Sequence, residues 1–227
     1  MAHAVKHHPG IPLLEQYVEG TLEADIALAV AAHIDLCPHC QQLCLDLAAE
    51  QGLLLEQSAP PPEQQLSDDM DAMLAEIMAQ PQLDSRELPH QLSPVQVQLR
   101  DKTFTVPRAL ARLVGQHTKW TQLGSIANAK LPAGDKRHVS LLYIDKDTAI
   151  PQHTHKGLEI TLVLSGRIVD EQGSYGVGDL LINTPDDTHS PRTLPNEDCL
   201  CLSVLSAPLQ FNKGITRLLN PLQHLFY

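Results

Sequence analysis

The sequence predicts an α+β protein, in which an N-terminal helical module is followed by a small antiparallel β-barrel or sandwich. Two observations support this prediction. Apolar residues recur at helical spacing up to residue 80, and short β-rich runs punctuated by glycine and proline follow from residue 95 onward. At 227 residues and 43% hydrophobic content, the chain can bury the cores of two modest domains.

Four helices are expected in the first part. The first ends at Gly20, a helix C-terminal signal, and the second starts from Thr21 as its N-cap. Pro38 occupies a favoured first position of the third helix, and Ser67 caps the fourth, which Pro81 stops. The expected spans are residues 13–18, 21–37, 38–57 and 67–80.

An apolar stripe with three methionines lies on the fourth expected helix. Such a stripe usually packs into a core, and we expect this here, although Met-rich faces also bind partners adaptably. The stripe consists of Met70, Met73, Leu74, Ile77 and Met78.

A proline-containing stretch with little periodicity separates the helices from the β-rich part. We therefore assign residues 1–85 to a helical domain, 86–94 to a linker and 95–227 to a β domain. The clearest strand-like runs of the β domain are 138–144, 158–164, 179–182 and 199–205.

The net charge of −11 is divided unequally along the chain. Residues 1–90 contain two basic against fifteen acidic side chains, whereas residues 91–227 contain fourteen basic against twelve acidic. The acidic part repels nucleic acid and attracts basic protein surfaces, which argues against a DNA-binding regulator. No apolar run approaches the ~20 residues of a membrane helix. We therefore expect a cytoplasmic protein without direct membrane or nucleic-acid contact.

A first ligand constellation lies at the junction of the second and third expected helices. His33 precedes Cys37 by one helical turn, and Cys40 follows three residues later, so three ligands can converge on one ion. Both thiols lie at a helix N-terminus, which favours the thiolate that zinc requires. A tetrahedral site needs a fourth ligand, for which we choose His8, with His7 and His3 as alternatives.

This arrangement, with its leading histidine, resembles the zinc-binding anti-sigma family over roughly residues 5–80. The resemblance implies a small helical Zn²⁺ domain that binds an extracytoplasmic-function sigma factor and blocks its access to polymerase. The acidity of this part suits the basic surfaces of such a partner. Cys44 is expected to be a packed core thiol, and His39 a solvated residue.

A second constellation lies in the β domain. His153 and His155 are two residues apart and therefore project from the same side of a strand. With Glu159 and Gly166 they form an H-x-H-x3-E-x6-G string that resembles the first motif of the cupin family.

The segment from Gly178 to His189 resembles the second cupin motif and offers His189 as the fourth ligand. It departs from the usual form, because acidic residues follow Pro185 and the proline-to-histidine spacing is one residue short. Three histidines and a carboxylate suit several divalent metals, with Zn²⁺ as our first choice and iron, manganese or nickel as alternatives.

Cys199 and Cys201 project toward one face of an expected strand. We expect them to be small apolar core residues rather than a thiol sensor, because reactivity depends on thiolate character and access.

The order of zinc module, linker and cupin resembles the ChrR anti-sigma factors over nearly the whole chain. This resemblance implies that the helical module inhibits the sigma factor and that the cupin relieves inhibition under photooxidative or peroxide-like stress. We therefore expect no enzyme activity. The main alternative is a cupin metalloenzyme, such as a dioxygenase, with an accessory zinc-binding module. A neighbouring sigma-factor gene would favour regulation, and a metabolic operon would favour catalysis.

Overall fold

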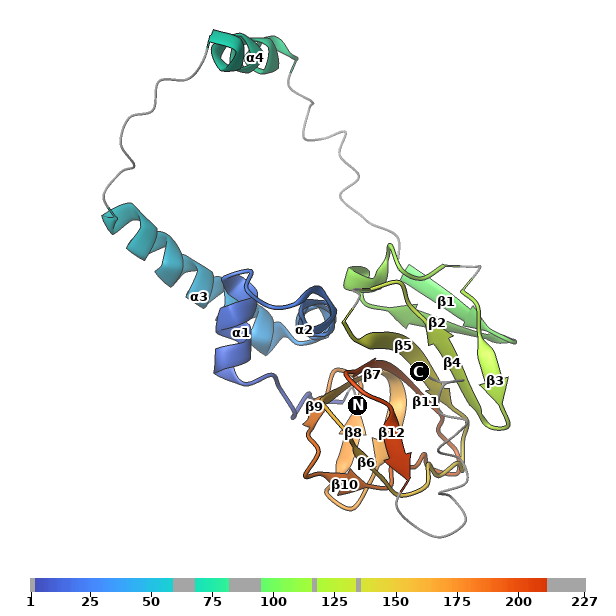
Figure 1. Cartoon of the computed structure of the whole chain (residues 1–227). Helices are drawn as coiled ribbons and strands as arrows, with labels where there is room; N and C mark the ends of the chain where they lie inside the picture. Colours follow the sequence, from blue (N-terminus) through green and yellow to red (C-terminus); the bar gives the residue numbers. More distant parts are fainter. Residues whose placement is uncertain (1–2, 59–67, 82–94, 116–117, 134–135, 212–227) are drawn as a thin grey trace. The chain divides into compact units, whose positions relative to one another are not determined.

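The computed structural model describes residues 3–58, 68–81, 95–115, 118–133 and 136–211 (Figure 1). Among these, residues up to Ala48 and from Val95 onward form one compact unit, and residues from Ala49 to Pro81 belong to a second. The expected linker 86–94 and the expected cap Ser67 lie outside the described residues, so the domain limits stay a prediction.

The helices have the expected order. They are α1 (Ile11–Val18), α2 (Ala24–Leu36), α3 (Pro38–Gln57) and α4 (Asp68–Ala79). Gly20 follows α1 with φ of +70°, the left-handed conformation that glycine adopts at low cost after a helix. Pro38 is the first residue of α3, as expected.

The expected N-cap of α2 is wrong. The cap is Glu23, and its side chain makes no capping hydrogen bond, whereas the hydroxyl of Thr21 donates back to the carbonyl of Gln16 at 3.2 Å. The acidic side chains at this end pair with Arg137 of the β domain instead. Tertiary ion pairs have thus replaced the local capping bond.

The apolar stripe of α4 is exposed, contrary to the expected core position. Its side chains range from Met70 at 49% to Met78 at 77% exposed. No described residue from 49 to 81 is buried, so this unit has no core of its own within the described part of the chain. The apolar spacing defines one face of the helix, but it does not specify what covers that face.

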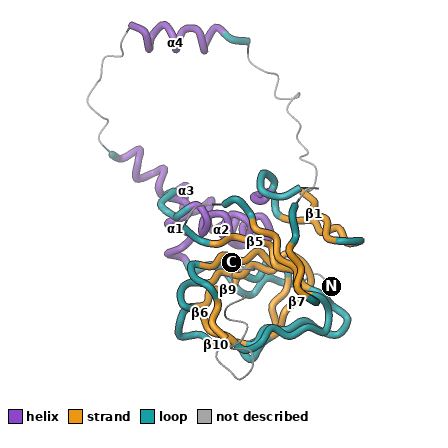
Figure 2. Tube along the Cα trace, turned by 45° about the vertical axis from the view of Figure 1, so that its right-hand side comes forward, coloured by secondary structure: helices purple, strands orange, loops and turns teal. Residues whose placement is uncertain are grey.

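The strands of the β domain, orange in Figure 2, pair antiparallel, as predicted. One sheet has the order β3-β4-β5-β11-β7-β8, and β9 pairs with β7; smaller sheets are β10-β6-β12 and β1-β2. The bounds are β1 Val95–Leu99, β2 Lys102–Val106, β3 Thr121–Leu123, β4 Ile126–Lys130, β5 His138–Ile144, β6 His153–His155, β7 Glu159–Val169, β8 Ser174–Gly176, β9 Leu180–Asn183, β10 Thr188–His189, β11 Cys199–Leu205 and β12 Leu209–Phe211, with a 3-10 helix η1 at Arg108–Leu110.

The central strand β11 lies between β5 and β7, and all its residues are buried because a core cluster covers each of its two faces. Leu200 and Leu202 face the main core, where Ala29 and Ala32 of α2 also pack. Cys201 faces the other way and lies in a second core cluster. It also lines a cavity that His153 and His189 line. Helix α2 is thus packed on the β domain through small side chains that allow close approach.

Within the described residues, no helix combines the length and apolar character that crossing a bilayer requires.

The glycine of the first cupin motif gives a test of the fold. A Cβ on Gly166 would lie 1.8 Å from the carbonyl oxygen of Asp198, and φ is +70°. We expect Gly166→Ala to lower the free energy of unfolding by roughly 3 kcal/mol or more. The control Gly124→Ala has φ of +59° but open space around its Cβ, and should cost about 1–2 kcal/mol. Chemical denaturation measures both variants. An equal loss of unfolding free energy in Gly166→Ala and Gly124→Ala would contradict the predicted clash.

Candidate metal centres

The first predicted ligand set converges at the α2–α3 junction. His33 lies in the last turn of α2, Cys37 follows that helix, and Cys40 lies in the first turn of α3. His8 reaches the same point from the segment before α1. One potential ligand atom from each of the four residues lies within 4.8 Å of the others. Of the three candidate histidines, His8 is the one whose ring lies with the other three potential ligands.

The donor atoms of this cluster suit a tetrahedral zinc ion. The Nδ1 atom of His8 lies 3.4 Å from the Sγ atoms of both Cys37 and Cys40. The Nδ1–H of His33 donates to the carbonyl oxygen of Gly178 at 2.8 Å, which leaves Nε2 as the ligating atom. That Nε2 is buried and has no hydrogen-bond partner among the described residues. A bound cation would satisfy it.

Burial controls the protonation of these donors. It lowers the pKa of His33 to about 4 and raises the pKa of the Cys40 thiol to about 12. The expected thiolate at the helix N-terminus is therefore not favoured by the protein alone. Zn²⁺ reverses this preference because it stabilises the thiolate and displaces the proton.

The other candidates near this cluster have different contacts. His3 binds the carboxylate of Asp179 through Nε2 at 2.7 Å, and His7 packs edge-on against Tyr175. His39 is exposed, as expected, and Cys44 is half-buried against the small helical core.

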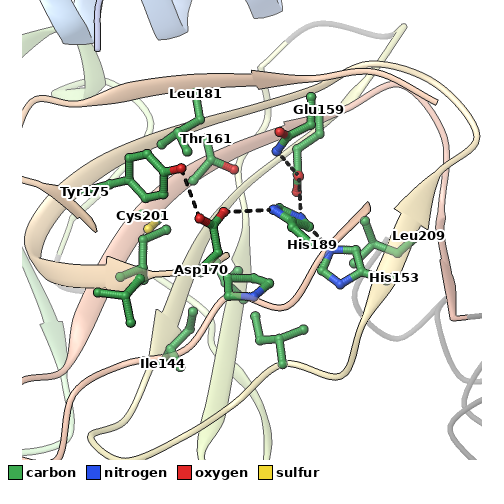
Figure 3. Close-up of a pocket in the computed structure, with 16 residues that line it drawn as sticks. Ile144, His153, Glu159, Thr161, Asp170, Tyr175, Leu181, His189, Cys201 and Leu209 are labelled. Carbon is green, nitrogen blue, oxygen red and sulfur yellow. Dashed lines mark hydrogen bonds and ion pairs between the residues drawn. The ribbon is translucent and has the colours of Figure 1, made fainter. Parts of the chain in front are cut away.

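The second predicted set lies inside the β domain on three different strands (Figure 3). Strand β6 supplies His153 and His155, β7 begins with Glu159, and β10 ends with His189. Pairing of β10 with β6 places His189 directly opposite His153. All four side chains are buried. The shortened second motif still brings its histidine to the site.

Three imidazoles converge on the carboxylate of Glu159. Its Oε2 lies 3.3 Å from Nε2 of His155 and 3.6 Å from Nε2 of His189. Nε2 of His189 also lies 3.0 Å from Nε2 of His153, whose Nδ1–H donates to the carbonyl of Pro151 at 2.9 Å. Burial lowers the pKa of His153 to about 4, so its imidazole stays neutral, as a metal ligand must be. A divalent metal fits this donor set.

Two supporting residues were missed by the sequence analysis. Asp170 lies 3.6 Å from Nδ1 of His189 through Oδ2, and its other oxygen accepts a hydrogen bond from Tyr175 at 3.0 Å (Figure 3). The amide of Asn183 donates to Oε2 of Glu159 at 3.1 Å. Such contacts orient metal ligands, but a single Asp or Asn in a β domain gives no sequence signal for them.

A cavity of about 50 Å³ adjoins the second cluster. His153, Glu159 and His189 line it, and the remaining walls are mostly apolar, including Ile144 and Leu181 (Figure 3). This volume admits a ligand of only a few atoms.

Cys199 and Cys201 are buried, and their Sγ atoms lie 3.4 Å apart. A hydrogen bond between the thiols and burial both raise the pKa of Cys199 well above its usual range. The thiolate form of Cys199 is thus disfavoured, and the burial of both residues agrees with their expected core position.

The chain is similar to known proteins of one family. Residues 113–208 match the family model described as the ChrR Cupin-like domain. The Anti-sigma-E factor ChrR of Cereibacter sphaeroides is 36% identical over 221 residues, covering 96% of this chain and 97% of the relative. The crystal structure of Rhodobacter sphaeroides SigE in complex with the anti-sigma ChrR contains a chain with a TM-score of 0.67 and 32% identity, covering 89% of this chain and 99% of that chain.

Separate ligand substitutions test whether each cluster holds a metal ion of its own. We expect Cys37→Ser to abolish zinc at the helical cluster and His153→Ala to abolish metal at the cupin cluster, because each removes one of four ligands. Elemental analysis of the purified full chain should show one metal fewer in each variant. The control Cys44→Ser should retain wild-type metal content. Unchanged metal content in Cys37→Ser would contradict the helical site.

Proposed function

This chain belongs to the ChrR family of anti-sigma factors, and we propose that it sequesters an extracytoplasmic-function sigma factor and releases it under oxidative stress. In this proposal the helical module holds Zn²⁺ and binds the sigma factor, and the cupin cluster holds a divalent metal and senses a singlet-oxygen or peroxide-like signal. The protein acts as a regulator rather than an enzyme. It acts in the cytoplasm, where a sigma factor meets RNA polymerase.

The exposed apolar surface of α3 and α4 supports sigma binding most directly. Leu53, Leu54 and Leu55 of α3 are exposed, as is the whole Met-containing stripe of α4. None of the described residues of this unit is buried, so its apolar side chains gain stability when a partner covers them. Flexible methionines suit such a partner surface. An amphipathic helix placed in an apolar groove is a common way of binding.

Charge supports the same partner. The acidic excess of residues 1–90 continues on α4, where Asp69, Asp71 and Glu76 are exposed beside the apolar stripe. A sigma factor presents basic surfaces for DNA and polymerase, and an acidic surface accelerates encounter with them.

The cupin cluster supports the sensing role. Its four donors are buried, so their access to solvent is restricted, yet the adjoining cavity of about 50 Å³ admits a molecule of a few atoms. A small oxidant in this cavity would lie against His153, Glu159 and His189, which line it. Oxidation at the cupin metal, or exchange of one of its ligands, would alter the positions of Glu159 and His189, which lie on different strands.

A substitution on α4 tests the sigma-binding surface. We expect Met73→Asp to weaken binding of the cognate sigma factor by about 2 kcal/mol, because it places a charge within the apolar contact. The control Ala72→Asp adds the same charge on the opposite face of the same helix and should bind nearly as wild type. Calorimetry of the full chain measures both. Equal losses would show that charge alone, rather than the stripe, sets affinity.

Cupin variants test the release step. We expect the sigma complexes of His153→Ala and Glu159→Ala to form normally but to persist after oxidative challenge, because the sensing metal is lost. Size-exclusion chromatography before and after treatment measures free sigma factor. Normal release from both variants would show that the cupin metal does not mediate the response.

A further inference from the structure

The turn between β8 and β9 lies against the helical zinc cluster rather than in solvent. It comprises residues 177–179 and contacts the segment that leads to His8 on one side and the ring of His33 on the other. These contacts come from the β domain, whereas every zinc ligand comes from the helical module. The zinc cluster therefore has supporting residues from outside its own module.

Asp179 is the centre of these contacts. Its carboxylate has no exposed surface and accepts hydrogen bonds from the backbone N–H of Lys6 at 2.6 Å and of His7 at 3.0 Å. It also accepts from His3 at 2.7 Å and from the N–H of Gly176 at 2.9 Å. Although burial alone would raise its pKa, the hydrogen bonds from Lys6, Gly176 and His7 hold the pKa below its usual value. The carboxylate thus stays ionised.

The backbone next to the ligand His8 is fixed at both its polar groups. Asp179 accepts the N–H of His7, and the N–H of Leu180 donates to the carbonyl of His7 at 3.0 Å. Such pairing leaves His8 little freedom to leave the cluster.

Two glycines permit the close approach of the two segments. A Cβ on Gly176 would lie 2.7 Å from the ring of His3, and one on Gly178 would lie 2.6 Å from Val5. Gly178 also has φ of +92°, which directs its carbonyl toward His33 at 2.8 Å. Larger residues would separate the turn from the zinc ligands.

The same turn leads directly to the cupin cluster. Strand β9 begins at Leu180 and ends at Asn183, whose amide donates to the ligand Glu159 at 3.1 Å. A displacement of Glu159 would therefore act on β9 and, through it, on the turn that holds His8 and His33.

Accepting the two metal sites of the proposed function, we propose that the β8–β9 turn, with Asp179 as its positioning residue, holds the zinc ligands in place and connects them through β9 to the cupin cluster. The zinc site of the full chain then depends on the β domain, although none of its ligands lies there. The cupin metal would influence how firmly zinc is held.

Substitution of Asp179 tests the positioning role in the full chain. The amide of Asp179→Asn cannot accept all four N–H groups, so we expect zinc release to a chromogenic chelator to accelerate about 10-fold or more. In the cobalt-loaded protein the d–d bands should shift, and the thiolate-to-cobalt band reports only the cysteine-containing cluster. Wild-type release with unchanged bands would overturn the positioning role.

The matched control is Asp25→Asn. Asp25 is also buried and also joins the helical module to the β domain, through Arg137 at 2.8 Å, but its hydrogen bonds go to Arg137 and to the N–H of Ile26 rather than to the segment before His8 or to the β8–β9 turn. It should release zinc at the wild-type rate. An equal acceleration would show general loosening of the module and overturn the specific role of Asp179. If circular dichroism shows that Asp179→Asn lowers the folded fraction, His3→Ala replaces it as the test, because it removes one hydrogen bond to Asp179. We expect His3→Ala to accelerate zinc release less than Asp179→Asn does. Zinc release at the wild-type rate would contradict the positioning role.

The connection through β9 has its own test. His153→Ala, which removes the cupin metal, should accelerate zinc release in the chain that retains Asn183 and should have no effect in an Asn183→Ala background. The connection would be overturned if His153→Ala left the rate of zinc release unchanged in the chain with Asn183, or if it accelerated zinc release equally in both backgrounds. A wild-type chain without zinc at its cysteine cluster would instead refute the proposed function, so the two failures are distinguishable.

Discussion

The carboxylate of Asp179 is buried completely between the helical module and the β domain, and its hydrogen bonds hold these two parts together beside the zinc cluster. A buried charge is tolerated only when its oxygens are fully bonded, which fixes the backbone around it. Because Lys6 and His7 lie just before His8, this constraint also fixes a zinc ligand. The arrangement of the cysteine cluster thus depends on a residue that ligates nothing.

The two compact units have opposite physical properties. The first buries its polar ligands and its apolar side chains around two metal clusters, whereas the described part of the second exposes nearly all its apolar residues. Burial makes the first unit sensitive to small displacements, because close-packed groups cannot shift independently. Exposure leaves the second free to adapt to a partner surface. In the proposed function, sensing and binding would therefore be separated along one chain, with the cysteine cluster lying on α2 and α3, next to the second unit in sequence.

Features that depend on residue spacing within one helix or strand could be predicted from the sequence, whereas contacts between distant segments could not. Periodicity relates His33 to Cys37 by one helical turn and His153 to His155 by two strand residues. Glu159 and His189 were instead predicted from the resemblance to the cupin motifs. The prediction of Thr21 as the N-cap of α2 was wrong, and the acidic side chains at this end of the helix pair with Arg137 in the tertiary structure. The stripe of α4 was expected in a core because spacing defines a face but not its cover. Asp179 and Asn183 carried no signal, since their roles arise only when distant strands and segments meet.

Hydrogen exchange in the sigma-bound full chain tests the connection between the two clusters most directly. Exchange at residues 3–8 and 176–183 would be compared between the wild-type protein and Glu159→Gln. The account predicts faster exchange in both segments of the variant, because the N–H groups bonded to Asp179 and His7 lose protection when β9 is released. Faster exchange confined to the cupin ligand strands, with residues 3–8 unchanged, would contradict it.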